Sequence, residues 1–419
     1  MLPVVVEGEI LNPPKTAYIL LWFPDPTETF IFREVINLRK MGLPLKIFTL
    51  YGELSQHLSP EMSAVSGQVE RMGIPYLAGV LPEVRYWLKK NRKETKKLFR
   101  TVPFRRWNGL EKAGENLWAF IAGFRLARRM QEEGIEHIHA PWACGAATAA
   151  WVASRLTGIP FTFTARAWDI YPPDGALREK IRDAAFVRCE TMANVRFLTG
   201  LSGDPGKFRL TYNGVPLKVQ NEAPVSMTPP YKFLAVGRFV GKKGYNYLLH
   251  ACRILKDSGL DFTLTLAGGG PREKQLKMLA WKLDLNSHVR FPGFVPYHQV
   301  SDLFHNADIF LMPSVIHSSG DRDGIPTVIM EALMHRVPVV ATDVSGIAEL
   351  IEDGNTGALI REKDPDAIAG AVVRLLGDRT EALDMAERGR RRVLERFNPE
   401  INHRAVLNLY RDLPAVSRT

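Results

Sequence analysis

The sequence predicts an α/β protein of two doubly wound domains, each with a parallel sheet covered by helices on both faces. Short runs that are apolar throughout alternate with amphipathic helical patterns along almost the whole chain. Such runs are typical of parallel strands whose two faces are both buried. The chain has 419 residues, more than one hydrophobic core usually organises. A Pro-rich, polar stretch at 213–232 separates two sets of these runs, so it is the expected domain boundary.

In the first half, the apolar runs predict strands joined by helices. The pattern places strands at 16–23, 45–50, 137–140, 161–165 and 195–199, and helices at 29–40 and 144–157. After the first strand, Thr27 or Thr29 can accept a hydrogen bond from the first turn of the next helix and so cap it. We expect the first domain to span residues 1–215.

The second half repeats the same alternation and predicts a second domain at 216–396. The pattern places strands at 232–237, 261–268, 289–293, 307–314, 337–342 and 356–360. A last helical pattern follows at 397–413, and we expect the segment 397–419 to pack back on the first domain. Ligands of open parallel sheets bind beyond the carboxyl ends of the strands. The expected site is therefore the cleft between the two sheets.

Composition excludes several classes of protein. The three cysteines lie far apart, with no Cys-x-x-Cys pair, which argues against a disulfide framework or a zinc site and favours a reducing cytoplasm. No apolar run approaches the roughly 20 residues needed to cross a bilayer. Residues 1–15 lack the basic start and apolar core of a secretory signal, so we expect a cytoplasmic location.

The formal net charge of +10 is concentrated in one segment, 85–129, which holds 14 basic and 3 acidic residues. Trp87, Phe99, Phe104 and Trp107 are interleaved with them. This pattern fits either a solvated helical face or a surface for anionic lipid headgroups at the inner face of the cytoplasmic membrane. It also fits a polynucleotide, but nothing else in the chain resembles a nucleic-acid-binding module, so we expect no nucleic acid partner.

One loop of the second domain carries two carboxylates that frame a helix start. Asp323 follows the strand at 307–314, and Glu331 lies about five residues into the next helix. Pro326 suits the first helical position, and the free N–H groups of that turn form an anion site. A diphosphate could rest there, with sugar hydroxyls accepted by a carboxylate on either side. The alternative is a turn residue followed by an exposed helix residue.

The loop after the first strand of this domain adds two cations. Gly237 allows a close backbone approach, Arg238 stands at the strand end, and Lys243 lies where the next helix should begin. Two cations beside an anion site would neutralise two phosphates. The spacing differs from a P-loop. No cluster of metal ligands is evident, so we expect neither a metal nor a cofactor.

At residues 232–396 the sequence resembles the donor domain of GT-B glycosyltransferases, specifically the retaining glycosyltransferase family 4. The matching segments, in the family's order, are "VGRFVGKKG", "LAGGGP", "VRFPGFV", "ADIFLMPS", "DGIPTVIMEAL" and "VPVVATDVSGIAELIEDGNTG". The first half resembles it more loosely, through "FPDPTETFIFREV", "WDIY" and "YNGV", and is similar to members active on exported polysaccharides. The resemblance implies a first, acceptor-binding domain and a second, donor-binding domain.

The resemblance also implies roles for the matching residues. Arg238 and Lys243 would hold the donor diphosphate, Asp323 the sugar hydroxyls and Glu331 the ribose. Phe294, in the segment 291–295, would lie by the nucleobase. The full donor set is Gly237, Arg238, Lys243, Phe294, Asp323, Gly324, Ile325, Pro326, Thr327 and Glu331, of which Arg238, Lys243 and Asp323 are the expected catalytic residues. The implied reaction is metal-independent hexosyl transfer with retention of configuration.

The acceptor side departs from the family pattern. Relatives commonly have His where Arg166 stands, and Arg166 cannot act as a base. It could pair with an anionic group on the donor or acceptor; the alternative is an internal ion pair. Asp323 also replaces the family's usual Glu. The expected cleft residues are Glu28, Thr29, His139, Arg166 and Asp169. For His137 and His139, packing at a strand end is favoured over a metal pair, and His139 is retained as an acceptor-side candidate.

The leading hypothesis is a retaining glycosyltransferase that moves a sugar from a UDP- or GDP-sugar to a glycan or lipid-linked acceptor, in cell-surface polysaccharide or glycolipid synthesis. Two alternatives stay open. One is a nucleotide-sugar-binding protein with impaired catalysis, suggested by Arg166. The other is a different GT-B enzyme, such as a nucleotide-sugar epimerase.

Overall fold

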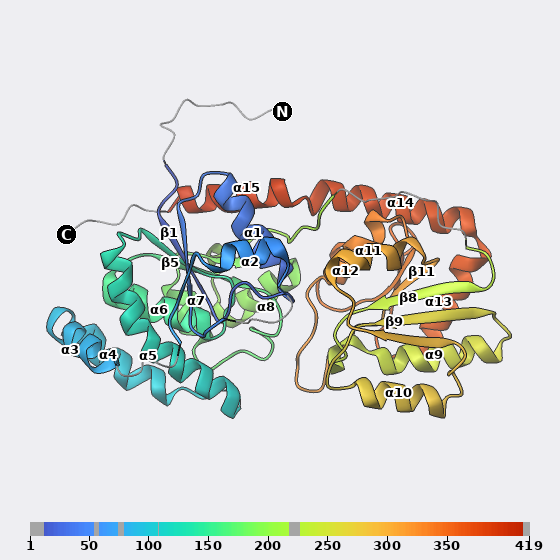
Figure 1. The fold of residues 1–419 in the computed structure, drawn as a ribbon, viewed down its shortest axis with the longest axis horizontal. Helices are drawn as coiled ribbons and strands as arrows, with labels where there is room; N and C mark the ends of the chain where they lie inside the picture. The colour runs from blue at the N-terminus through green and yellow to red at the C-terminus, as the bar shows by residue number, and fades with distance from the viewer. Residues whose placement is uncertain (1–11, 54–57, 74–78, 108, 218–226, 414–419) are drawn as a thin grey trace.

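A computed structural model describes residues 12–53, 58–73, 79–107, 109–217 and 227–413. These residues form two α/β domains, each built on a fully parallel sheet with helices on both faces (Figure 1). The predicted fold class is therefore confirmed. The linker segment that contains the predicted domain boundary falls partly on 218–226, outside the described residues.

The first sheet has the strand order β3-β2-β1-β4-β5-β6-β7, which places β1 at the centre of the domain. Its strands are β1 (Thr16–Leu20), β2 (Leu45–Thr49), β3 (Val69–Arg71), β4 (His137–Ala140), β5 (Phe161–Ala165), β6 (Val187–Cys189) and β7 (Phe208–Leu210). Its helices are α1 (Thr29–Lys40), α2 (Pro60–Ser66), α3 (Val80–Lys90), α4 (Arg92–Thr101), α5 (Leu110–Glu132), α6 (Gly145–Thr157), α7 (Leu177–Asp183) and α8 (Met192–Ser202).

The second sheet has the order β10-β9-β8-β11-β12-β13. Its strands are β8 (Tyr231–Val236), β9 (Phe262–Ala267), β10 (Val289–Gly293), β11 (Ile309–Met312), β12 (Val339–Thr342) and β13 (Ala358–Ile360). Its helices are α9 (Tyr245–Asp257), α10 (Glu273–Lys282), α11 (Tyr297–His305), α12 (Thr327–Met334), α13 (Pro365–Gly377) and α14 (Arg379–Arg396). In both sheets the strand order reverses beside the first strand, which is where α/β proteins bind ligands.

The last helix, α15 (Pro399–Arg411), lies against the first domain although it follows the second in sequence (Figure 1). Val406, Leu407 and Tyr410 belong to the first hydrophobic core. The Tyr410 hydroxyl lies 3.0 Å from the hydroxyl of Tyr18 on the central strand β1. The chain thus crosses back between the domains through α14 and α15.

One predicted strand is wrong. Residues 195–199 lie within helix α8, whose first turn is capped by Thr191: its hydroxyl accepts a hydrogen bond from the Asn194 N–H at 3.0 Å. Asn194 and Leu198, four residues apart, are both buried on one face, as helical spacing requires. The true strand of this region is β6, which the sequence prediction missed.

Candidate functional site

Asp323 and Lys243 form a buried ion pair at the carboxyl end of the second sheet. Lys243 Nζ lies 2.9 Å from Asp323 Oδ2, and the Ser314 hydroxyl donates to the same oxygen at 2.7 Å. Lys242 Nζ lies 3.8 Å from the other oxygen. Burial alone would raise the pKa of Asp323, but the two lysines and Ser314 outweigh it, so the pKa lies below its ordinary value. The acid is therefore ionised and held in a fixed position.

Close backbone packing brings these residues together. Lys243 ends a short 3-10 turn, Gly241–Lys243, and Gly244 follows with φ +64°. A Cβ on Gly244 would lie 1.9 Å from the carbonyl oxygen of Pro313, just after β11. A Cβ on Gly268, after β9, would lie 2.0 Å from the carbonyl oxygen of Gly237, after β8. Glycine at these positions lets the loops after β8, β9 and β11 meet at one point.

The start of α12 provides free backbone donors beside the ion pair. The helix begins at Thr327 and Pro326 is its cap residue. The sequence predicted Pro326 as the first helical residue, so the helix begins one residue later than predicted. Within the described part of the chain, the N–H groups of Gly324, Ile325, Thr327 and Val328 donate no hydrogen bond. Four free donors at the positive end of a helix are suited to bind an anion.

The remaining donor-side candidates lie around this point with different exposure. Arg238 is exposed and its guanidinium has no partner among the described residues, so it is free to bind an anion. Phe294 is 61% exposed. Glu331 is half-buried, and burial raises its pKa while Arg33 of the first domain opposes that shift. Glu331 therefore lies on the side of α12 that is nearest to the first domain.

Arg166 is enclosed by acids of its own domain. One of its terminal nitrogens forms a short ion pair with Glu190, and the other lies 3.8 Å from Glu34. Its guanidinium also packs over the rings of Phe30 and Trp142, at 4.6 and 5.3 Å from their centroids. Arg166 is only 4% exposed. The arrangement is the internal ion pair that the sequence left open as the alternative to an anionic ligand.

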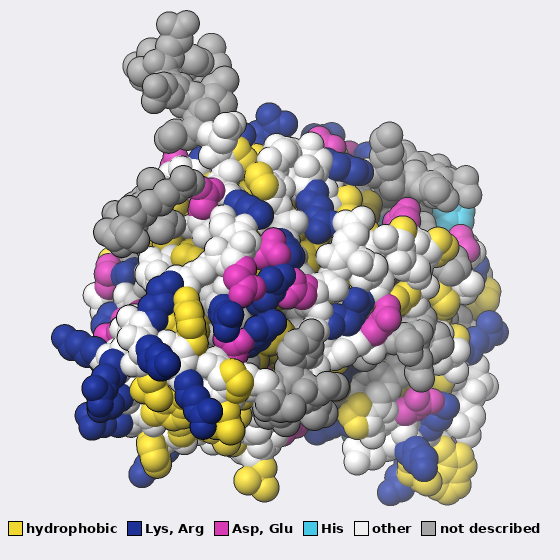
Figure 2. All heavy atoms as spheres, turned by 60° about the vertical axis from the view of Figure 1, so that its left-hand side comes forward, with side chains coloured by type: hydrophobic (Ala, Val, Ile, Leu, Met, Phe, Trp, Pro, Cys, Tyr) yellow, Lys and Arg dark blue, Asp and Glu magenta, His cyan; other side chains and the backbone are white. Residues whose placement is uncertain are grey.

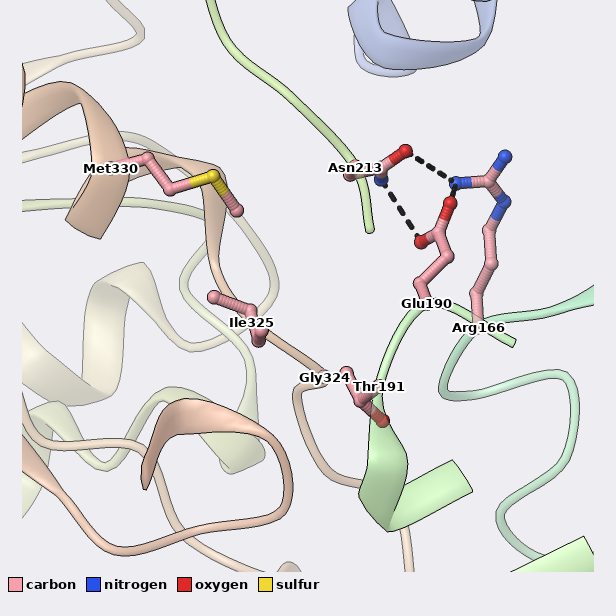
Figure 3. Close-up of a pocket in the computed structure, with 7 residues that line it drawn as sticks. All are labelled: Arg166, Glu190, Thr191, Asn213, Gly324, Ile325 and Met330. Carbon is pink, nitrogen blue, oxygen red and sulfur yellow. Dashed lines mark hydrogen bonds and ion pairs between the residues drawn. The ribbon is translucent and has the colours of Figure 1, made fainter. Parts of the chain in front are cut away.

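A pocket between the domains has this ion pair as one wall. Figure 3 shows Arg166 and Glu190 on one side of the pocket and Ile325 and Met330 on the other. The complete lining is Arg166, Glu190, Thr191, Asn213, Gly324, Ile325 and Met330. A Cβ on Gly324 would lie 3.4 Å from the carbonyl oxygen of Arg166. The turn of the second domain that carries the free N–H groups therefore faces the loop of the first domain that carries Arg166.

Glu28, Thr29 and Asp169 lie near this loop but are engaged differently. Burial raises the pKa of Glu28 to about 7; nearby Asp25 and Asp169 add to the shift, while Trp142 and Arg166 oppose it. The predicted threonine cap is not made: Glu28 is the cap residue of α1 and its side chain forms no capping bond. Thr29 instead accepts a hydrogen bond from Arg33 at 2.7 Å.

Asp169 fixes the loops after β4 and β5. Its carboxylate accepts hydrogen bonds from the backbone N–H groups of Ala143 and Ala167, at 2.9 and 2.7 Å. Asp169 is 2% exposed, so it supports the loops of the cleft wall from inside the domain.

His139 does not reach the cleft, contrary to the sequence prediction. It is fully buried within β4, and its ring nitrogens lie 2.7 and 3.1 Å from the hydroxyls of Thr162 and Thr164 on the neighbouring strand. Burial holds its pKa well below the ordinary value. The reason is that this sheet buries both faces, so a strand histidine points into the core. Among the described residues, no group of His, Cys, Asp and Glu is arranged to hold a metal ion.

Sequence reasoning missed two residues of the site. Lys242 shares Asp323 with Lys243 and also pairs with Asp321 at 3.1 Å; the adjacent lysines of "GKKG" were a signal for it. Glu349 bridges the domains, because its carboxylate accepts the N–H groups of Met192 and Ala193 at the start of α8, at 2.8 and 3.0 Å. No local pattern in the sequence marks that contact.

Comparison with known proteins identifies the second half of the chain. Residues 220–392 match the family model described as glycosyl transferases group 1. This part of the chain is a group 1 glycosyltransferase domain. It contains Arg238, Lys243, Asp323 and Glu331, so the group 1 domain carries the whole donor-side cluster.

Glycosyltransferases with curated names match a little under half of this chain. WcaL of Escherichia coli (strain K12), named for colanic acid biosynthesis, is 37% identical over 185 residues, 44% of this chain and 46% of that relative. AmsK of Erwinia amylovora, an amylovoran biosynthesis glycosyltransferase, is 35% identical over 204 residues, 48% of this chain and 50% of that relative. The matches thus span about half the length of these relatives.

Solved structures extend the likeness to both domains at the level of fold. Anabaena Alr3699/HepE in complex with UDP-glucose aligns with a TM-score of 0.70 over 95% of this chain and 100% of that chain, at 15% identity. The two domains therefore have the GT-B fold, with the group 1 domain as its second half.

Proposed function

We propose that this protein is a retaining glycosyltransferase that moves a sugar from a nucleotide-diphosphate sugar to a hydroxyl of a glycan or lipid-linked acceptor. The observation that carries the proposal is the ion pair of Lys243 with Asp323 beside the free N–H groups of α12. The names of the relatives from Escherichia coli and Erwinia amylovora support a role in cell-surface polysaccharide synthesis. We place the reaction at the inner face of the cytoplasmic membrane, where lipid-linked acceptors are held.

In the proposed reaction, the donor diphosphate occupies the start of α12. Arg238 and Lys243 neutralise it, and the free N–H groups of Gly324, Ile325 and Thr327 bind its oxygens. Preorganised charges of this kind act where charge develops as the leaving group departs. Asp323, anchored by Ser314, accepts hydrogen bonds from the donor sugar. Glu331 accepts the ribose hydroxyls.

The acceptor hydroxyl attacks the anomeric carbon on the face that the diphosphate leaves, so configuration is retained. The bond from that carbon to the diphosphate oxygen breaks, and the new glycosidic bond forms. The acceptor proton passes to the departing phosphate oxygen, so neither a general base nor a metal is required. The donor is a UDP- or GDP-sugar.

Substitution of Lys243 tests the proposal. We expect Lys243→Ala to lower turnover on the order of 10²–10³-fold, the usual effect of removing one group that stabilises a transition-state anion. Lys256→Ala is the matched control, because Lys256 lies on the far end of α9 and pairs with Asp284. Wild-type turnover in Lys243→Ala would overturn the assignment.

A screen of nucleotide sugars separates this function from its alternatives. A glycosyltransferase is stabilised thermally by its donor and slowly transfers the sugar to water. A binding protein with impaired catalysis would be stabilised without hydrolysis. An epimerase would return an isomeric nucleotide sugar rather than free sugar and nucleoside diphosphate.

A further inference from the structure

The first domain carries an exposed surface of large apolar side chains beside unpaired cations, here named the helical patch. Leu81, Phe104 and Leu110 are 67%, 80% and 94% exposed; they lie in α3, in the turn after α4 and at the start of α5. Its exposed cations, which form no ion pair with any described residue, are Arg85, Lys89, Arg92, Lys93, Lys96, Lys97, Arg100 and Arg106. On α4 the cations recur at helical spacing and share one face.

This patch differs from the aromatic and basic set that the sequence suggested at 85–129. Trp87 is fully buried, and its indole N–H donates to the carbonyl oxygen of Phe124 at 2.9 Å. Trp107 packs against the core. Arg125 and Arg129 are held by carboxylates, at 2.6 Å from Glu83 and 2.7 Å from Glu70. The apolar contribution therefore comes mainly from leucines and Phe104.

The second domain has a smaller surface of the same kind on α10, here named the α10 patch. Lys274, Lys277, Met278 and Trp281 follow one another at helical spacing and share one face. Met278 is 53% exposed and Trp281 is 63% exposed. Exposed apolar side chains that recur in this way, with lysines around them, are typical of a helix that lies on a membrane surface.

The two patches lie on the same side of the molecule. In Figure 1, α3, α4, α5 and α10 lie along the lower edge, while α14 and α15 lie along the upper edge. Figure 2, turned about the vertical axis, shows Lys and Arg side chains interleaved with hydrophobic ones at its lower left and lower right. Because a rotation about the vertical axis does not change the height of any atom, both views place the two patches at the lower edge of the molecule.

We propose that the helical patch and the α10 patch together form one contact face for an anionic lipid bilayer. This inference rests on the proposed function, because a lipid-linked acceptor is held at such a surface. It adds which helices of each domain contact the membrane. Lysines and arginines bind anionic headgroups, and exposed leucine, methionine and tryptophan side chains enter the interface. Among the described residues, no helix is long and apolar enough to cross a bilayer.

The chemistry of the patches favours a bilayer over other partners. Single-stranded nucleic acid binds through stacking on aromatic rings, whereas Leu81, Leu110 and Met278 are not aromatic and only Phe104 and Trp281 of the named apolar side chains offer a ring. Interfaces between proteins are depleted in lysine, which is abundant in both patches. Contact through both domains would also orient the cleft relative to the bilayer.

Binding to vesicles tests the proposal. We expect the full chain to sediment with vesicles of phosphatidylcholine and phosphatidylglycerol, and not with phosphatidylcholine alone. Replacing Lys96, Lys97 and Arg100 by Gln should lower the partition coefficient on the order of 100-fold, because each cation contributes about 1 kcal/mol. Replacing Met278 and Trp281 by Ala should lower it on the order of tenfold.

Matched controls lie on the opposite edge of the molecule. Ile401 is 56% exposed and Arg404 is exposed, both on α15; Ile401→Ala and Arg404→Gln should bind vesicles as wild type does. Full binding by the Met278→Ala/Trp281→Ala variant would overturn the two-domain contact. Salt-dependent binding to single-stranded DNA equal to that to anionic vesicles would overturn the assignment of a lipid partner.

A labelled variant reports the contact directly. The three native cysteines are buried, so a dye on Met278→Cys labels one exposed site. We expect its emission to shift to the blue on anionic vesicles, and no shift for Ile401→Cys. Donor-induced thermal stabilisation is measured on every variant. Retained donor binding with lost vesicle binding supports the contact face when it occurs in the patch variants, and overturns it when it occurs in the wild type. Lost donor binding with retained vesicle binding in the wild type would count against the proposed function alone.

Discussion

Replacing Glu34 with Gln tests whether the buried charges behind the cleft wall hold the first domain together. Glu34, on α1, is fully buried. Its carboxylate lies 2.5 Å from Arg188 on β6 and accepts a hydrogen bond from Tyr18 at 2.9 Å. Arg166 and Glu190 complete the cluster, so two acids balance two cations. Glu34→Gln keeps the shape and removes one negative charge.

The expected loss of folding free energy is large because the substitution leaves a buried cation with neither its counter-charge nor water around it. Removing one partner of a buried ion pair typically costs about 3–5 kcal/mol. In a domain of this size each kcal/mol lowers Tm by about 2–4 °C, so Tm should fall by roughly 6–20 °C. Burial alone would raise the pKa of Glu34, but Arg188 and Arg166 outweigh it and the pKa is lowered. The stabilisation is therefore present above the ordinary carboxyl pKa and is lost as pH falls.

Urea unfolding at pH 7 measures the effect. Asp257→Asn is the control, because Asp257 forms an exposed pair with Arg253 at 2.8 Å, and such a pair contributes at most about 1 kcal/mol. Adding Arg188→Met to Glu34→Gln restores the charge balance, so the double variant should lose less than the sum of the single variants. A loss for Glu34→Gln no greater than for Asp257→Asn would refute the reasoning.

Three further predictions concern pH, backbone and domain contact. Because the pKa of Glu28 is raised to about 7, the stability of the wild type should fall as pH rises from about 5 to 8, and Glu28→Gln should remove that part of the pH dependence of Tm. Gly244→Ala should unfold more easily in urea than Gly259→Ala: both glycines have positive φ, but only at Gly244 would a Cβ clash with backbone. Glu349→Gln should increase the radius of gyration measured by X-ray scattering, because it weakens the cap on α8, whereas Glu352→Gln, at an exposed pair, should not.

Three strands were predicted with the bounds that the structure gives them. The strand predicted at 289–293 coincides with β10, and the strands at 137–140 and 161–165 coincide with β4 and β5. β6 has only three residues and Arg188 is the middle one, so it lacks an apolar run; only the fold supplies Glu34 to neutralise that cation. β3 contains Glu70 and Arg71 and lies at the sheet edge, so it also lacks an apolar signature.

Part of the candidate site followed from the sequence for a simple reason. Loops after parallel strands emerge at one edge of the sheet, so the pattern could bring Lys243 and Asp323 to the same edge. It could not show that they pair directly, nor that Lys242 shares the acid. The sequence pattern could not predict where the side chains on the acceptor side point. His139 lies on a strand with both faces buried, and the acids that enclose Arg166 come from distant elements.

Charge is arranged differently on the two sides of the pocket, and this bears on how an anionic donor is received. In the first domain, Arg166 and Arg188 are matched by Glu34 and Glu190, so that wall carries little net charge. In the second domain, Arg238 has no partner among the described residues, and the start of α12 adds a positive dipole end. In the proposed function, the attraction for the donor diphosphate would therefore come from the second domain and not from the wall that carries Arg166. A cation at position 166 is therefore compatible with anion binding at the start of α12, because its charge is already balanced within the first domain.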